Sequence, residues 1–113
     1  MWSNNMSKTE MIRKLNDDFR TSFEGGKVML TIGIRAKSDI EQTKILERVL
    51  NFHDFNHSND PYGEHDMGRF DHNGERIIWK IDYYDKDYRY MSENPADPTI
   101  TNRVLTIMTG SEW

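Results

Sequence analysis

Hydrophobic residues recur at helical spacing in two stretches of the chain. From residue 8 onward, apolar side chains lie three or four positions apart. Ser7 followed by Glu10 has the spacing of a capping box, in which each side chain bonds the other's backbone N–H. This pattern predicts an amphipathic helix over residues 8–22. The same pair recurs at Ser38 and Glu41 and predicts a second helix there.

Apolar and polar side chains alternate in other stretches, as they do on a strand with one buried face. Residues 27–35 alternate in this way and predict a strand whose single glycine marks a bulge or a close backbone approach. Residues 67–72 and 75–85 flank Asn73-Gly74. Because both turn residues tolerate the positive φ of a type I′ turn, these segments predict a β-hairpin.

The last quarter of the chain holds a short strand pattern followed by a helical one. Tyr88 and Tyr90 mark a candidate strand over residues 86–92. Asp97 and Pro98 have the order of an N-cap and a first helical residue. A final helix, ended by Gly110, is predicted from apolar residues spaced i, i+4, i+7 and i+8, namely Ile100, Val104, Ile107 and Met108.

The predicted order of elements is helix, strand, helix, loop, hairpin, helix. One apolar sheet face with helices packed on it gives an α+β domain of two layers. We therefore expect an antiparallel sheet of roughly three to four strands with about three helices packed on it. This single domain covers residues 7–113 and follows a flexible N-terminus at residues 1–6.

Length and composition fit one small domain. The 113 residues allow a single core, and 35% hydrophobic with 30% charged residues indicate a small core under a heavily charged surface. The absence of cysteine excludes a disulfide framework, a thiolate metal site and a cysteine nucleophile. The first 25 residues show no apolar run of the signal-peptide type, and no segment has the length of a membrane span. We therefore expect a cytoplasmic protein.

The net charge of −4 is unevenly distributed along the chain. Residues 1–51 carry nine Lys or Arg against seven Asp or Glu, whereas residues 54–93 carry five against ten. Because carboxylates repel phosphates, the acidic part disfavours direct binding of nucleic acid and suits a basic protein partner. A well-hydrated surface without any partner explains the same asymmetry.

All four histidines fall within residues 53–72, among several acidic residues. Imidazole and carboxylate are ligands for zinc, manganese or non-haem iron, so a small metal-dependent enzyme built on this segment is one alternative. His53 and His57 would align on a helix, but Pro61 indicates a loop, and no HExxH signature, nucleophile elbow or phosphate-binding glycine loop is present. We therefore assign no catalytic residue, no metal ligand and no cofactor.

Acidic and tyrosine side chains gather in the loop over residues 52–66 and in the stretch 79–90. A loop of this length is uncommon inside a small domain and is often functional. Trp79, Ile81 and Tyr83 share the predicted inward face of a strand, and tyrosines outside that face are typical interface anchors. The candidate partner-binding surface comprises Asp60, Tyr62, Glu64, His65, Asp66, Asp82, Tyr84, Asp85 and Asp87.

The segments LNDDFRTSFEGGKVMLTIGIRA, NDPYGEHDMGRF, WKIDYYDKD, NPADP and RVLTIM occur in this order along the chain. In combination they resemble an uncharacterised bacterial family, domain-of-unknown-function family number 3768, from about residue 14 to residue 112. The resemblance implies a short, free-standing protein of a kind frequent on plasmids and other mobile elements of proteobacteria. It implies no catalytic residue.

Small acidic proteins of mobile elements often counter host defence, which is an inference by association. We therefore expect an interaction protein that inhibits a nucleic-acid-targeting defence complex, foremost a CRISPR–Cas effector, by occupying a basic surface. The alternative within the same context is a regulatory or antitoxin-like partner of another protein. No membrane is expected as a partner, and the oligomeric state stays open.

Overall fold

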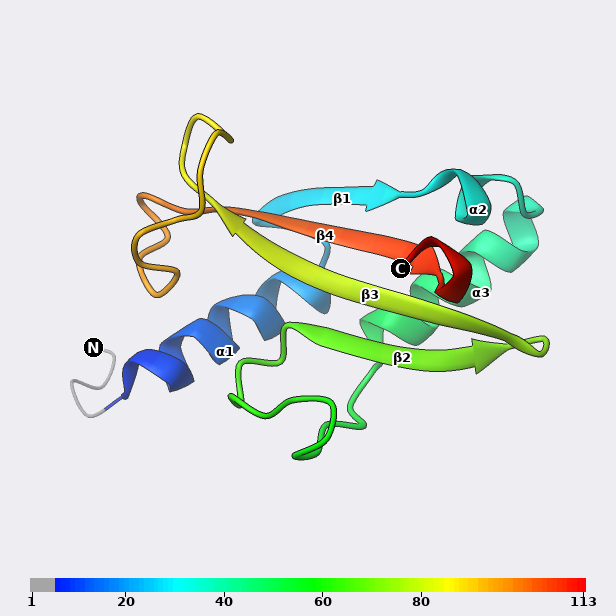
Figure 1. Ribbon diagram of the computed structural model, residues 1–113, viewed down its shortest axis with the longest axis horizontal. Coiled ribbons are helices and arrows are strands. Elements are labelled where there is room, and N and C mark those ends of the chain that lie inside the picture. Colours follow the sequence, from blue (N-terminus) through cyan, green and yellow to red (C-terminus); the bar gives the residue numbers. More distant parts are fainter. Residues whose placement is uncertain (1–5) are drawn as a thin grey trace.

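The computed structural model describes residues 6–113, which form a four-stranded sheet and three helices (Figure 1). The elements are α1 (Lys8–Arg20), β1 (Gly26–Leu30), α2 (Ile32–Arg35), α3 (Asp39–Leu50), β2 (Met67–His72), β3 (Glu75–Tyr84), β4 (Asn102–Thr109) and the 3-10 turn η1 (Gly110–Glu112). The expected α+β fold is confirmed. The expected flexible N-terminus at residues 1–6 lies, apart from Met6, outside the described residues.

The sheet has the strand order β1-β4-β3-β2, so β1 and β2 are its edges. Strands β2, β3 and β4 are antiparallel neighbours, whereas β1 runs parallel to β4. The sheet is therefore mixed, which corrects the antiparallel sheet expected from the sequence. The parallel pair is possible because the long connection through α2, α3 and the hairpin brings β4 back beside β1 in the same direction.

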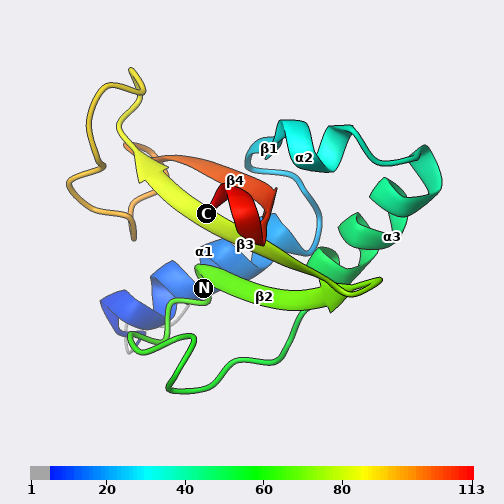
Figure 2. The same ribbon diagram turned by 45° about the vertical axis from the view of Figure 1, so that its right-hand side comes forward.

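Helices α1 and α3 lie on the same side of the sheet (Figures 1 and 2). Phe19 of α1 and Ile45 and Val49 of α3 join one core cluster with Trp79 of β3 and Leu105 of β4. The predicted inward face of β3 is confirmed, since Trp79 is fully buried in this cluster. None of the helices within residues 6–113 is long and apolar enough to cross a membrane.

The helix starts predicted at Ser7 and Ser38 and the predicted hairpin turn are present. The Ser7 hydroxyl accepts the N–H of Glu10 at 3.1 Å, and the Glu10 carboxylate accepts the N–H of Ser7 at 3.4 Å. At the start of α3, the Ser38 hydroxyl accepts a backbone N–H in the same way. The hairpin between β2 and β3 turns at Asn73 and Gly74, whose φ angles are 50° and 80°.

The strand predicted over residues 27–35 ends at Leu30, and α2 follows it. The chain turns here because the Thr31 hydroxyl and the N–H of Gly33 donate to the Glu112 carboxylate, at 2.6 Å and 2.9 Å. Gly33 marks a close approach and not a bulge, since a Cβ on it would lie 2.6 Å from that carboxylate.

The final helix predicted after Pro98 is wrong, because this segment holds the central strand β4. Both faces of β4 are buried. On one face Val104 is 7% exposed and Met108 is 5% exposed, and on the other face Leu105 and Ile107 are fully buried. A strand buried on both faces is apolar at nearly every position. Helical spacing can therefore be found in it by chance.

Residues 85–101 form a loop where the sequence predicted a short strand and a helix start. A single isolated bridge, between Tyr84 and Met91, replaces the strand expected over residues 86–92. Asp97 accepts the N–H of Thr99 at 2.9 Å and its hydroxyl at 2.6 Å, which closes a local turn.

Candidate functional site

The long loop between α3 and β2 is held against α1 by side chains of that helix. Arg13 Nε donates to the carbonyl of Gly63 at 2.6 Å, and Asn16 Nδ2 donates to the carbonyl of Glu64 at 3.0 Å. Gly63 has φ 71°, a conformation that glycine adopts without strain. The loop is therefore fixed at its second half, where the predicted site residues lie.

Four carboxylates meet where this loop joins the sheet, and we call them the acidic corner: Asp60, Glu64, Asp66 and Asp82. The carbonyl of Asp66 accepts the N–H of Ile81 at 2.8 Å, which places Asp66 beside the end of β3. Burial raises the pKa of Asp66, and the charges of Glu64, Asp60 and Asp82 raise it further. The other three carboxylates are thus close enough to Asp66 to disfavour its charged form.

Asp60 and His65 of the predicted surface bond mainly to the protein itself. The Asp60 side chain is buried, and its Oδ1 accepts the N–H of His65 at 3.1 Å. The His65 ring lies with Nδ1 at 2.9 Å from Asp17 Oδ1 and Nε2 at 3.6 Å from Asp60 Oδ2. The same ring stacks on Phe55, with centroids 3.7 Å apart and planes inclined by 4°. These contacts order the loop around the acidic corner.

Glu64 takes part in a polar network beneath the corner. The Tyr83 hydroxyl donates to Glu64 Oε1 at 2.7 Å, and Asn16 Nδ2 donates to the Tyr83 hydroxyl at 2.8 Å. Arg103 Nε in turn donates to Asn16 Oδ1 at 2.7 Å. Burial, followed by the bond to Glu64, raises the pKa of Tyr83 far above its usual value, so this hydroxyl stays protonated as a donor.

The remaining predicted residues differ in how far they face solvent. Tyr62 is 80% exposed, and Asp87 is also exposed. Asp82 pairs with Lys80 at 2.9 Å. Asp85 is partly buried and accepts the N–H groups of Asp87 and Arg89, at 3.2 Å and 3.0 Å. Tyr84 is also partly buried, and its ring centroid lies 6.2 Å from that of Tyr88. Tyr84 and Asp85 thus contact residues 87–89 of the loop after β3.

The other three histidines have separate neighbours. His53 Nδ1 lies 3.1 Å from the carbonyl of Asn51, and the buried His72 has Nε2 at 3.5 Å from Glu41 Oε1. His57 is exposed. Within the part of the chain that the structure describes, no three His, Asp or Glu side chains converge as a metal site.

Sequence reasoning missed the helix residues that support the acidic corner. Asn16 is fully buried, and it lies one turn after Ile12 and one turn before Phe19 on the buried stripe of α1. A polar residue inside an apolar stripe is unusual, because a buried amide needs hydrogen-bond partners. That interruption of the apolar stripe is the sequence signal that could have revealed the network.

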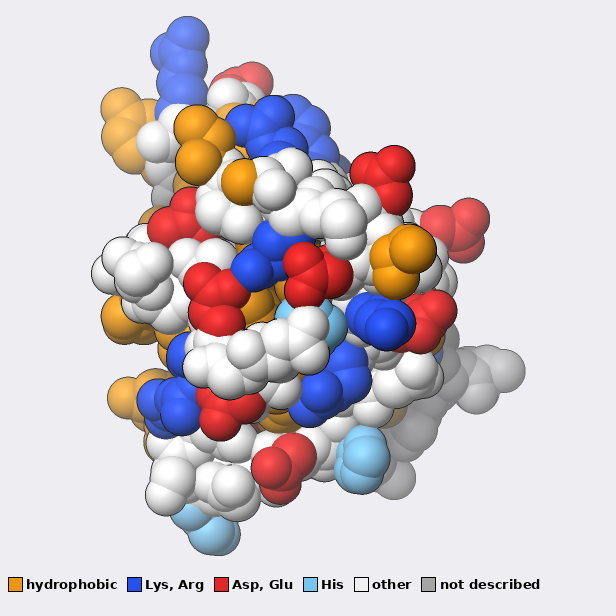
Figure 3. Space-filling model, turned by 90° about the vertical axis from the view of Figure 1, so that its right-hand side faces the viewer, with side chains coloured by type: hydrophobic (Ala, Val, Ile, Leu, Met, Phe, Trp, Pro, Cys, Tyr) orange, Lys and Arg blue, Asp and Glu red, His pale blue; other side chains and the backbone are white. Residues whose placement is uncertain are grey.

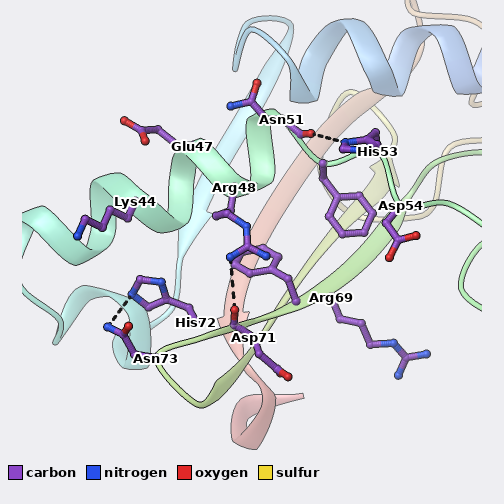
Figure 4. A pocket seen from close by; sticks show the side chains of 12 residues that line it. Lys44, Glu47, Arg48, Asn51, His53, Asp54, Arg69, Asp71, His72 and Asn73 are labelled. Carbon is purple, nitrogen blue, oxygen red and sulfur yellow. Dashed lines mark hydrogen bonds between the residues drawn. The ribbon is translucent and has the colours of Figure 1, made fainter.

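A groove between α3 and β2 also escaped the sequence patterns. It has a volume of about 770 Å³, and none of the corner carboxylates lines it (Figure 4). Basic and acidic side chains are intermixed on this end of the molecule (Figure 3). The lining comprises Lys44, Glu47, Arg48, Asn51, Phe52, His53, Asp54, Arg69, Phe70, Asp71, His72 and Asn73.

Comparison with known proteins yields one match. A family model described as protein of unknown function (DUF3768) matches residues 30–112, which run from the last residue of β1 to the end of η1 and include the whole acidic corner. No curated protein and no solved structure matches the chain.

Proposed function

We propose a function from the premise that this chain belongs to the DUF3768 family of proteins of unknown function. It is an interaction protein, and the acidic corner together with Tyr62 binds a basic surface of a protein partner. The partly exposed carboxylates Glu64, Asp66 and Asp82 meet lysine and arginine side chains, and the Tyr62 ring anchors the contact.

The observation that carries this proposal is the negative charge around Asp66, whose carboxylate takes part in no ion pair among the described residues. Among the described residues, Lys80 is the one lysine or arginine that pairs with a corner carboxylate, Asp82. Burial and, after it, the neighbouring carboxylates raise the pKa of Asp66, so the site favours the arrival of a positive charge. Tyr62, 80% exposed, stands on the same loop as a large side chain with little contact of its own.

The preferred partner is a nucleic-acid-targeting defence complex, foremost a CRISPR–Cas effector. Such complexes hold nucleic acid in positively charged channels, and an acidic protein surface competes for the same charges. The mobile-element setting that the family resemblance implies supports this choice. Direct binding of nucleic acid is disfavoured, because the corner has the same sign of charge as phosphate.

The test is capture of partners from a host that carries CRISPR–Cas systems, with the tagged chain as bait. We expect an effector subunit to be recovered, and the double variant Asp66→Asn/Asp82→Asn to recover about tenfold less because it loses the charge pairs of the interface. The matched control, Asp18→Asn/Glu24→Gln, removes the same charge from exposed positions outside the corner and should capture as the wild type does.

Two results would contradict the proposal. One is the recovery of no effector subunit together with undiminished interference in a phage-plating assay. The other is equal capture by the corner variant and its control. Recovery of a toxin or a replication protein instead would favour the regulatory alternative.

A further inference from the structure

The free edge of the sheet at β2 presents unpaired backbone groups at alternate residues. His72 and Glu75 flank the two-residue turn and form a hydrogen-bonded pair. Because such pairs alternate along an antiparallel ladder, the backbone groups of Phe70 and Gly68 also bond to β3. Met67, Arg69 and Asp71 therefore turn their N–H and C=O groups away from β3. Only one hydrogen bond to these groups is present within residues 6–113, from Arg48 Nη1 to the carbonyl of Asp71 at 3.4 Å.

The space beside this edge is a walled groove. The hollow of about 770 Å³ between α3 and β2 and a second hollow of about 330 Å³ share the lining residues Arg69, Phe70 and Asp71. Asp54, Asn56, Ser58 and Asn59 also line it, and the segment between α3 and β2 runs alongside the free side of β2 in both ribbon views (Figures 1 and 2). A strand added to a sheet lies about 4.8 Å from its neighbour, and both hollows lie beside Arg69 and Asp71 of β2.

The charges along the groove favour a negatively charged occupant. Among the described residues, Lys44, Arg48 and Arg69 line it without a carboxylate partner. Arg48 is held over the Phe70 ring at 4.5 Å, at the floor of the groove (Figure 4). Asp71 is already paired with Arg76 at 2.9 Å.

The opposing charges are two lining acids, Glu47 of α3 and Asp54. Against the three unpaired cations these two acids leave a net excess of one positive charge in the lining.

We propose that an extended, acidic segment of a partner protein adds to β2 as a fifth strand of the sheet. Its backbone bonds to Arg69 and Asp71, and its alternate carboxylates meet Arg48 and Lys44 on one side and Arg69 on the other. A thin extended segment is favoured over a second copy of this chain, because Asp54, Asn56, Ser58 and Asn59 line the space beside this edge. The surface is separate from the acidic corner.

The test is amide NMR of the full ¹⁵N-labelled chain with a pool of blocked heptapeptides in which Thr and Val alternate with Glu. We expect chemical-shift changes centred on Met67, Arg69 and Asp71. The matched pool with Gln in place of Glu should bind about tenfold more weakly, as expected for lost charge-assisted hydrogen bonds. A Glu pool with every second amide N-methylated should not bind, because it cannot complete the ladder.

Protein variants separate the charges from the edge. Arg48→Gln/Arg69→Gln should abolish the preference for the Glu pool, whereas Lys8→Gln/Arg89→Gln, at exposed positions outside the groove, should keep it. The corner variant Asp66→Asn/Asp82→Asn should also keep it, so failure of the proposed function leaves this proposal standing. Unchanged amides in β2 at millimolar peptide, equal binding of both pools, or a dimer paired through β2 in sedimentation would overturn it.

Discussion

Asp66 in the acidic corner and Glu112 at the C-terminus carry the same charged group in opposite surroundings. Glu112 accepts the Thr31 hydroxyl at 2.6 Å, the Thr109 N–H at 2.8 Å and the Gly33 N–H at 2.9 Å. The bond from Thr31, followed by the two backbone bonds, lowers the pKa of Glu112 to about 2. Around Asp66, burial and three other carboxylates raise the pKa instead.

The charge of Glu112 therefore stabilises the fold, whereas the charge of Asp66 destabilises it. Glu112 joins η1 to the junction of β1 and α2, and every contact favours its charged form. The charged form of Asp66 is disfavoured by its neighbours, and no internal lysine or arginine among the described residues offsets this. Sequence choices that oppose stability are expected at functional sites. This is why the corner, and not the C-terminus, is the proposed interface.

The largest effect is expected from removing the support beneath the corner with Asn16→Ala. The fully buried Asn16 amide bonds Arg103, Tyr83 and the carbonyl of Glu64. Its loss leaves buried polar groups unpaired and should lower the free energy of unfolding by about 2–4 kcal/mol. Urea denaturation measures this. The exposed Asp18→Ala on the same helix is the control, and a loss below about 1 kcal/mol for Asn16→Ala would show that the network is not a support.

A smaller, local effect is expected for His65→Asn. Asn tolerates the φ of 54° at this position but lacks the ring that stacks on Phe55 and reaches Asp17 and Asp60. Backbone amides of residues 60 and 62–66 should exchange with solvent about tenfold faster, the equivalent of about 1.4 kcal/mol of local stability. Hydrogen exchange read by mass spectrometry tests this. Faster exchange across the whole sheet would instead indicate a global loss.

The stabilising role of the Glu112 charge is tested with Glu112→Gln. The folded pKa of Glu112 lies below the usual 4.5, so its charge contributes stability above about pH 4.5 that is lost as the pH falls toward 2. The variant should have a lower Tm than the wild type at pH 7, and the gap should close toward pH 2. Glu24→Gln, at an exposed position, is the control. A gap that does not change with pH would contradict the role of the charge.

The smallest effect is the repulsion between Asp66 and Asp82 themselves. A double-mutant cycle compares the effect of Asp82→Asn on the free energy of unfolding in the wild type and in Asp66→Asn. The substitution should be more stabilising, or less destabilising, in the wild type, because only there does it remove the repulsion from Asp66. A coupling of a few tenths of a kcal/mol is expected, because both groups are partly exposed and Lys80 screens Asp82. Unfolding in low salt measures it, and 1 M NaCl should remove it. A coupling of the opposite sign would show that the two carboxylates share a bridging group.

Local signals in the sequence predicted the elements that depend on neighbouring residues. Ser7 and Glu10 start α1, and Asn73 and Gly74 turn the hairpin, because each motif supplies its own hydrogen bonds or backbone conformation. The helix predicted in place of β4 failed because a strand buried on both faces has no period of its own. Its parallel pairing with β1 depends on residues far apart in the chain.

The sequence likewise predicted the acidic residues of the candidate site but not the residues that hold them in place. The loop acids and Asp82 were singled out as separate groups along the chain, and the pairing of Asp66 with Ile81 brings them together. Asp17 and Asn16, which hold the loop, act across 48 positions of sequence. No local pattern encodes a contact of that range.

The most direct measurement of the central claim is the Tm of Asp66→Asn against the wild type between pH 3 and pH 7. Because the folded pKa of Asp66 is raised above the usual 3.8, its charge lowers stability at neutral pH, and this penalty disappears as the pH falls below 3.8. We predict that Asp66→Asn melts higher than the wild type at pH 7, opposite in sign to Glu112→Gln, and that the difference fades toward pH 3. A lower Tm for Asp66→Asn at pH 7 would show that the corner carboxylates stabilise the fold, and would contradict the claim.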